Sequence, residues 1–472
     1  MIAESFLDPF TQTFAPAPFR ALARETGWQQ RTGKIDPFEF VASLVFAQMS
    51  ALRLSLNAQG QGLSEPVTPQ ALDQRYHERA VTFFAAAYAH CLRESLAQPP
   101  PAPLAAALRT HFTSVVLFDS TAMDLPPALA TLFPGCGGSA SPANVKVLLR
   151  FDYLQSQFEP LALLPGKASD QGRAQTVAAA LRAGELGLLD KGFFSLAALG
   201  QIAQAGAYFL TPLPRSVTVW TANAVRAFES LDVAGELRAT TAALVEWPAV
   251  RLGGGGGHAV AARVVAVRLS AESAGRHRAA LREAQRRQGR TPTAAALELA
   301  GWPREVTPAE GWFGERSTSR GWLILLTNAP AEKLPRTAVS YLYRVRWQIE
   351  LVFRTIKSVV RLDQTEGRKP ARVRCELWAR LIAAAVVFWW HGQVQAAAWR
   401  RGRWEISFEK LARQLQQHGL SLAQALVEGG ARLRAQLQRL WRQLLTGARR
   451  GRRKRRTTWQ NLQTHWLDVP SG

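Results

Sequence analysis

Hydrophobic and polar positions divide the chain into a helical beginning, a middle with short strands and a helical end. Residues 1–108 are predicted to be all-helical, with helix starts at Asp36-Pro37 and Thr68-Pro69. The run that follows Thr68 predicts one long amphipathic helix whose polar side carries Gln70, Gln74, Arg75 and Arg79. The proline-rich residues 98–103 then predict a linker.

The middle of the chain contains two short apolar runs that each end in an aspartate. These runs, Ser114–Asp119 and Leu186–Asp190, predict buried strands. Further strands are expected at residues 145–154, 158–164 and 208–211, and helices at residues 173–184 and 193–206. Three strands followed by alternating helices and strands predict a mixed α/β sheet.

A long segment separates Asp190 from the next polar cluster and predicts an inserted, mostly β unit. Strands are expected at residues 216–221, 237–247 and 259–269, with a loop at the glycine run 253–257 and a basic helix at 271–289. No Gly-Lys-Ser/Thr follows the glycine run, which argues against a phosphate-binding P-loop there. Ser319–Thr327 is expected to be the strand that returns the chain to the core.

The stretch from Tyr343 to Lys357 has no glycine or proline and predicts an α-helix. At about 100° per residue, Tyr343, Arg346, Glu350 and Lys357 fall within roughly 60° on one side. A separate apolar face is formed by Val345, Ile349, Val352 and Ile356, with Phe353 at its edge. A carboxylate between two cations can hold a divalent metal while the cations bind phosphate. The alternative is a surface helix with internal charge compensation.

Charge changes the picture, because the net charge is +23 over 472 residues. Such an excess points to a polyanion, nucleic acid before an anionic membrane, although arginine-rich proteomes raise the charge without any binding role. Cys91, Cys136 and Cys375 are far apart and predict reduced thiols rather than a disulfide framework or a zinc site. The beginning of the chain lacks a signal-peptide pattern.

The last part of the chain predicts helices and a basic tail. Helices are expected at residues 373–399, 408–417 and 422–445, the last with a break at Gly429-Gly430. The apolar run Leu381–Trp390 is about half the length of a membrane span and predicts a buried helix. Residues 449–456 hold seven cations in eight positions, which is typical of salt-sensitive DNA affinity or of a solubilising tail.

The spacing Tyr343-x2-Arg346-x3-Glu350-x6-Lys357 resembles the Y-R-E-K signature of bacterial insertion-sequence transposases of the IS-four type, in the DDE superfamily. This resemblance implies an α/β RNase H-like (retroviral integrase-like) core with a mostly β insertion, flanked by all-helical regions. The expected domains are a DNA-binding domain at 1–108, a catalytic core at 109–372 with the insertion at 213–320, and a helical region with the basic tail at 373–472.

The resemblance also implies roles for individual residues. Asp119, Asp190 and Glu350 would be catalytic and hold two Mg²⁺ ions, with Mn²⁺ as a substitute. Asp124, Asp152 and Asp170 are rivals for the first position, but none ends an equally apolar strand. Tyr343, Arg346 and Lys357 would position phosphates. Trp322 would stack on a flipped-out base, unless it is a core or sheet-edge residue, and Trp312 is its nearest competitor.

The implied function is a DNA transposase that binds the inverted-repeat ends of an insertion sequence. It would cleave them and transfer the 3′-hydroxyl ends into target DNA by cut-and-paste transposition. The expected partner is double-stranded DNA, held by a homodimer in the bacterial cytoplasm at the nucleoid, without a membrane. Two alternatives remain open: a metal-dependent nuclease without strand transfer, and an inactive or domesticated DNA-binding protein.

Overall fold

The structure is a computed structural model that describes most of the chain. The continuous described ranges are 4–50, 55–93, 107–135, 141–155, 157–168, 171–221, 229–253, 260–270, 321–346, 369–402, 404–451 and 458–466, and Glu350, Phe353, Lys357 and Gly367 are among the isolated described positions. The predicted linker at 98–103, Trp312, Asp170 and most of the glycine run and of the basic helix lie outside the described residues.

The first part of the chain is helical, as predicted. Its helices are α1 (Glu4–Thr13), α2 (Pro16–Glu25), α3 (Pro37–Met49), α4 (Leu56–Gln61), α5 (Pro69–Gln74) and α6 (Glu78–Arg93). Asp36 caps α3 by accepting from the backbone N–H groups of Phe38 and Glu39, and Thr68 caps α5. Both predicted helix starts are therefore confirmed.

The single long helix predicted after Thr68 is wrong, because the chain breaks between α5 and α6. Arg75 ends α5, and its guanidinium lies 4.2 Å from the ring centroid of Trp28 and donates to the Trp28 carbonyl at 3.1 Å. Arg79 donates to the carbonyl of Gly27. Contacts with the loop after α2 thus decide the geometry that the amphipathic pattern left open.

A ten-stranded mixed sheet forms the centre of the molecule, in the order β3-β2-β1-β4-β5-β10-β9-β8-β6-β7. β1, β2 and β3 pair antiparallel, whereas β4 pairs parallel to both β1 and β5. This arrangement fits the expected RNase H-like core. The bounds of these five strands are β1 Val115–Leu125, β2 Ala143–Asp152, β3 Gln157–Pro165, β4 Leu186–Leu188 and β5 Tyr208–Pro212.

The strands that follow β5 extend the same sheet. β10 pairs antiparallel with both β5 and β9, and β8, β6 and β7 follow outward. Their bounds are β6 Val219–Thr221, β7 Glu229–Ser230, β8 Leu244–Leu252, β9 Val260–Arg268 and β10 Trp322–Thr327. The strand predicted at 237–247 is wrong in its first half, because Asp232 caps a helix there, α10 (Val233–Ala239).

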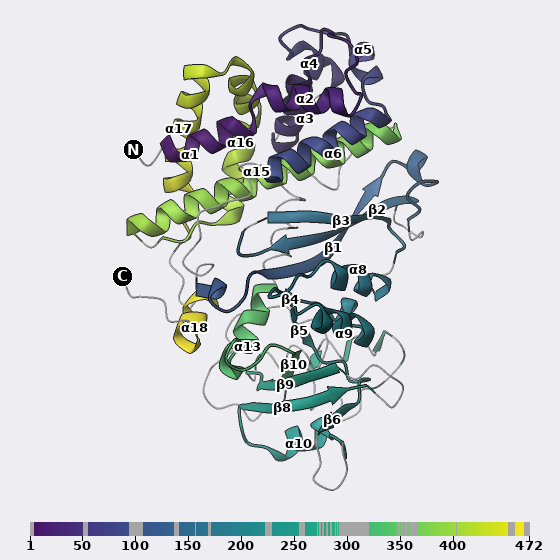
Figure 1. Cartoon of the computed structure of the whole chain (residues 1–472), viewed down its shortest axis with the longest axis vertical. Helices are drawn as coiled ribbons and strands as arrows, with labels where there is room; N and C mark the ends of the chain where they lie inside the picture. Colours follow the sequence, from purple (N-terminus) through teal and green to yellow (C-terminus); the bar gives the residue numbers. More distant parts are fainter. Residues whose placement is uncertain are drawn as a thin grey trace.

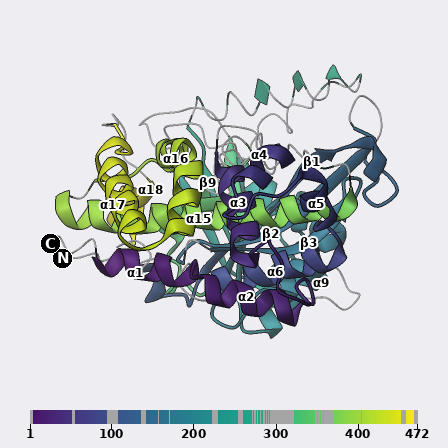
Figure 2. The same ribbon diagram turned by 90° about the horizontal axis from the view of Figure 1, so that it is seen from above.

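Helices cover both faces of the sheet and create two hydrophobic cores. On one face lie α8 (Ala174–Ala179) and α9 (Leu196–Gln204), which pack with alternate residues of β1, such as Val116 and Phe118. On the other face lies α15 (Pro370–Gly402), which packs with Val115 and Leu117. Figure 1 shows α15 running above β1–β3 with the N-terminal helices, and Figure 2 shows it beneath α3 and α16.

The long helix α15 has the length and composition of a membrane span, but 78% of its most apolar window is buried inside the protein. It includes Leu381–Trp390, so the predicted buried helix is confirmed. It is followed by α16 (Phe408–Glu428) and α17 (Gly430–Gly447). The predicted break is confirmed, because Gly429 and Gly430 have φ of 67° and 54°.

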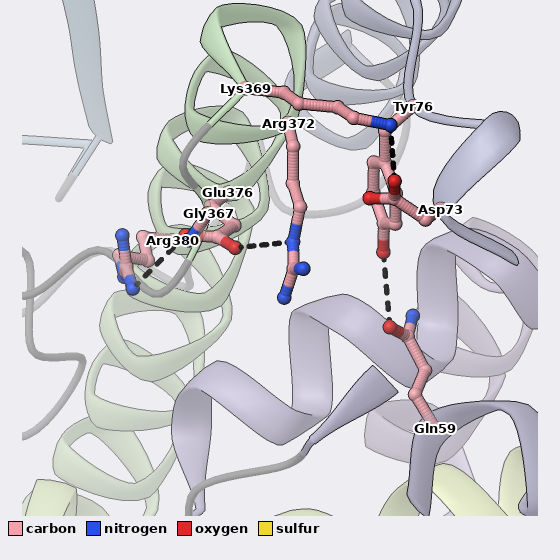
Figure 3. A network of polar contacts seen from close by, with 8 residues as sticks. All are labelled: Gln59, Asp73, Tyr76, Gly367, Lys369, Arg372, Glu376 and Arg380. Carbon is pink, nitrogen blue, oxygen red and sulfur yellow. Dashed lines mark hydrogen bonds and ion pairs between the residues drawn. The ribbon is translucent and has the colours of Figure 1, made fainter. Parts of the chain in front are cut away.

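Polar contacts fasten the start of α15 to the N-terminal helices (Figure 3). Lys369 pairs with Asp73 at the end of α5, and Arg374 pairs with Glu78 at the start of α6 at 2.7 Å. Within the helix, Arg372 contacts the buried carboxylate of Glu376 at 3.0 Å. The first and last parts of the chain therefore form a continuous helical layer above the sheet.

The basic segment that was predicted to be a tail lies between two anchored elements. At its start, Arg450 pairs with Glu405 at 3.0 Å, and the Arg449 guanidinium lies over the ring of Trp404. After it, α18 (Thr458–His465) packs on α13 (Arg336–Tyr343), where the rings of His465 and Tyr341 stack 4.9 Å apart. Residues 452–457 themselves lie outside the described part of the chain.

The helix predicted to start at Tyr343 is corrected by the structure. Tyr343 is the last residue of α13, and Arg344–Arg346 form a 3₁₀ turn. Val345 and Phe353 are buried, as the apolar face predicted. Ile349, Val352 and Ile356 lie outside the described residues, so the rest of that face stays a prediction.

Candidate active site

The two aspartates lie next to each other at one end of the parallel strands. β1 and β4 pair up to Leu117 opposite Leu188, so Asp119 and Asp190 each come two residues beyond the last pair. The sequence predicts that this strand ends at Asp119. In the structure β1 continues to Leu125, because β2 pairs along its other edge. Only the pairing of β1 with β4 ends before Asp119. Both carboxylates therefore follow the parallel pairing at the same edge of the sheet.

Each aspartate is oriented by a backbone hydrogen bond. Asp119 Oδ1 accepts from the N–H of Ser120 at 2.8 Å, and Asp190 Oδ1 accepts from the N–H of Lys191 at 2.7 Å. The second contact starts a 3₁₀ turn over Lys191–Phe193. Local backbone geometry therefore sets the direction of both side chains before any ligand is present.

Asp119 experiences the charges of the other site residues. The pKa of its carboxyl is about 7, raised from the usual value first by burial and then by the nearby carboxylates of Asp190 and Glu350. The Ser120 N–H and the Arg346 guanidinium act in the opposite direction. Three carboxyl groups and one guanidinium thus share a single electrostatic environment.

Glu350 is paired with a cation of the signature. Arg346 Nη2 lies 3.0 Å from Glu350 Oε1, with side chains that are 7% and 34% exposed. Burial by itself would lower the pKa of Arg346, but Tyr343 and the three acidic side chains raise it above its usual range. Arg346 is therefore a permanent cation that compensates the acidic cluster. Lys357 is half-buried.

Tyr343 points into the protein. Its ring is buried, and its hydroxyl donates to the carbonyl of Leu189 at 3.4 Å. Burial raises the pKa of the phenol well above its usual range, so the group is neutral. No residue motif could have disclosed this contact, because the acceptor is a backbone carbonyl.

Trp322 does not have the position that base stacking requires. The side chain is 1% exposed and belongs to the core beneath α8 and α9, and the Arg268 guanidinium lies 4.8 Å from the centroid of its ring. In this conformation the ring cannot reach a flipped-out base. The core alternative accounts for this placement, and the base-stacking role stays a prediction.

The rivals of Asp119 are separated from it by their contacts. Asp124 is an exposed residue of β1 that accepts from Asn144 at 2.9 Å. Asp152 is buried and accepts from the N–H groups of Leu154 and Gln155, as a turn residue does. Neither takes part in the electrostatic environment of Asp190 and Glu350 that surrounds Asp119.

The donor set fits divalent metal ions in its chemistry. Oxygen ligands from two aspartates and one glutamate suit Mg²⁺, and a cation between them would offset the repulsion that Asp119 experiences from Asp190 and Glu350. Among the described residues no three His, Cys, Asp or Glu side chains form a ready metal site. The cationic compensation in this structure comes from Arg346.

Comparisons with known proteins agree on one family. Residues 110–386 match the family model described as the transposase DDE domain. The chain is 24% identical to the transposase of insertion sequence IS231B from Bacillus thuringiensis subsp. berliner, over 96% of this chain and 93% of the relative. It is also 24% identical to the transposase of IS1151 from Clostridium perfringens, over 77% of this chain and 75% of the relative.

Among solved structures, the chain is similar to piggyBac transposase in its synaptic complex with hairpin DNA. The TM-score is 0.40 and the identity 10%, over 94% of this chain and 84% of that chain.

Proposed function

Because the chain belongs to the transposase DDE domain family and is a DNA transposase, we propose that it cuts the inverted-repeat ends of an insertion sequence and joins their 3′-hydroxyls to target DNA. The observation that carries this proposal is the placement of Asp119 and Asp190 beyond the pair Leu117–Leu188, within the electrostatic reach of Glu350.

The residues would divide the work as follows. Asp119, Asp190 and Glu350 would hold two Mg²⁺ ions, with Mn²⁺ as a substitute. DDE transposases use divalent metal ions, which supply a polarised nucleophile and stabilise the leaving oxygen. Arg346 and Lys357 would bind phosphate oxygens of the DNA end. Arg346 would then exchange Glu350 for phosphate, because its guanidinium is engaged by that carboxylate in this structure.

The domain division follows the same proposal. Residues 1–108 would bind the DNA end, 109–372 would carry the chemistry, and 373–472 would support pairing of two chains on DNA. The contacts of α15 with α5 and α6 support the idea that the first and last regions act together. Such a chain would work as a homodimer on the nucleoid of a bacterial cell, by cut-and-paste transposition.

The test is cleavage of a labelled duplex that carries the inverted repeats flanking the gene. We expect wild type to cut at the repeat boundary with Mg²⁺ and not with EDTA. Asp119→Asn and Glu350→Gln should lower cleavage by at least about 10³-fold while DNA binding persists, because only the ligands of the metal ions change.

Asp124→Asn is the matched control, since it removes an exposed carboxylate from the same strand. Its cleavage rate should remain within about twofold of wild type. Equal loss in Asp119→Asn and Asp124→Asn would overturn the assignment of Asp119. Binding without cutting by wild type under all conditions would indicate a DNA-binding relic.

A further inference from the structure

We propose that Tyr343 is a positioning residue, which holds the strand end bearing Asp190 against the Arg346–Glu350 pair and does not bind DNA phosphate. The inference rests on the proposed metal site. It begins with the hydroxyl of Tyr343, which donates to the carbonyl of Leu189 at 3.4 Å. Leu189 directly precedes Asp190, so this contact fixes the backbone beside the carboxylate.

Leu189 is held from its other side as well. Its N–H donates to the carbonyl of Leu210 on β5 at 3.0 Å. The peptide groups on both sides of Leu189 are therefore engaged, one by the sheet and one by Tyr343. Because β4 itself has three residues, the hydroxyl contact extends the ordering of this strand beyond its last pair, to the position where the carboxylate leaves the sheet.

The same phenol is linked to the second half of the site. The Arg346 guanidinium lies 5.9 Å from the centroid of the Tyr343 ring and contacts Glu350 at 3.0 Å. Tyr343 thus joins two segments that are far apart in sequence, one with Asp190 and one with Glu350.

A direct phosphate contact does not fit these observations. The Tyr343 side chain belongs to the hydrophobic core, and the residue is 5% exposed. A phosphate oxygen would have to displace the Leu189 carbonyl from the hydroxyl proton. That exchange would leave a buried carbonyl without its hydrogen bond, which costs free energy.

Tyr341 offers a matched control on the same helix. It is also buried, at 4% exposure, and its hydroxyl lies 3.3 Å from His465 Nε2 on α18. Tyr341 therefore loses a comparable hydrogen bond when changed to phenylalanine, but at a place that does not touch Asp190, Arg346 or Glu350. Removing each hydroxyl separates positioning of the site from general stabilisation of α13.

The experiment compares wild type, Tyr343→Phe and Tyr341→Phe as full-length chains. Mn²⁺ binding is measured without DNA from the electron paramagnetic resonance of the free ion. Binding to the inverted-repeat duplex is measured in EDTA over a range of salt concentrations. We expect Tyr343→Phe to weaken Mn²⁺ binding about 2- to 10-fold, the range for one lost hydrogen bond. Its DNA affinity and salt dependence should stay at the wild-type values.

Tyr341→Phe should leave Mn²⁺ binding unchanged. The inference is overturned if Tyr343→Phe lowers DNA affinity together with the salt slope, which indicates a phosphate contact. It is also overturned if both variants weaken Mn²⁺ equally or neither does. Failure of the proposed function would give a different result. Wild type would then bind no Mn²⁺, or would bind it no better than Asp119→Asn does.

Discussion

At the scale of single residues, the site brings together acidic groups whose negative charges repel one another. Asp119 is the clearest case, because burial and two neighbouring carboxylates hold its pKa near 7 in the folded chain. The ordinary value for an aspartate in an unfolded chain is about 3.9. The folded protein therefore retains a proton on Asp119 over a pH range in which the unfolded chain has lost it.

This difference predicts a pH-dependent effect of Asp119→Asn on stability. Between about pH 4 and pH 7 the folded state binds more protons than the unfolded state, so the free energy of unfolding falls as pH rises. Asparagine does not titrate, so the Asp119→Asn variant does not undergo this fall in the free energy of unfolding. In EDTA, we expect the variant to gain thermal stability over wild type at pH 8 and to gain less at pH 5. A gain that is equal at both pH values would contradict the shifted pKa.

At the scale of elements, capping and turn residues set most boundaries, and tertiary contacts move the others. Asp36 and Thr68 start their helices where proline follows them. In contrast, α13 ends at Tyr343 because the chain changes to a 3₁₀ turn at Arg344, in the middle of a sequence that contains no helix breaker. The signature residues therefore come from a turn as well as from helix, and their wheel positions do not give their directions.

The boundary between α16 and α17 makes a testable prediction. Gly429 has φ of 67° and ψ of −161°, a conformation that is open to glycine and strained for other residues. A Cβ atom there would meet nothing within 4 Å, so the strain is purely in the backbone. Gly429→Ala should lower the free energy of unfolding by about 1–3 kcal/mol in urea titrations.

Gly33→Ala is the control for this change, since its Cβ would also meet open space and its φ is not positive. It should leave stability unchanged or raise it slightly, because alanine restricts the unfolded chain. A similar loss in both variants would show that the backbone conformation at Gly429 is not the cause.

At the scale of the whole molecule, the helical layer ties distant parts of the sequence to the strand ends. The ion pair of Lys369 connects the start of α15 with α5 (Figure 3), and the ion pair of Arg374 connects it with α6. α18 returns the end of the chain to α13, the helix that leads into Arg346. The basic segment is therefore bounded by two fixed points rather than free at one end.

This anchoring divides the basic segment into two kinds of arginine. Arg449 and Arg450 are engaged within the protein, with Trp404 and Glu405 respectively. We expect serine substitutions throughout 452–456, which remove five cations, to lower the slope of log affinity against log salt by up to about 4.5, since each neutralised phosphate contributes about 0.9. The measurement is binding to the inverted-repeat duplex in EDTA.

The double variant Arg449→Gln, Arg450→Gln is the comparison for that experiment. It should leave the slope unchanged, because those side chains compensate protein groups. If this pair lowered the slope as much per cation as the 452–456 variant does, the two arginines would contact DNA in spite of their contacts in this structure.

The sequence by itself determined the features that depend on local pattern and chemistry. Apolar runs predicted the central strands, cap residues predicted α3 and α5, and the Y-R-E-K spacing identified the family to which the chain belongs. These inferences succeeded because propensity, periodicity and capping act over a few neighbouring residues.

Only the tertiary structure decided which of the candidate residues face one another. It placed Asp119 within a strand rather than at its end, because β2 continues to pair where β4 stops. It buried Trp322 between the sheet and its helices, and it turned Tyr343 toward the carbonyl of Leu189. Each outcome depends on contacts between segments far apart in sequence, and such contacts leave no periodic signal in the chain.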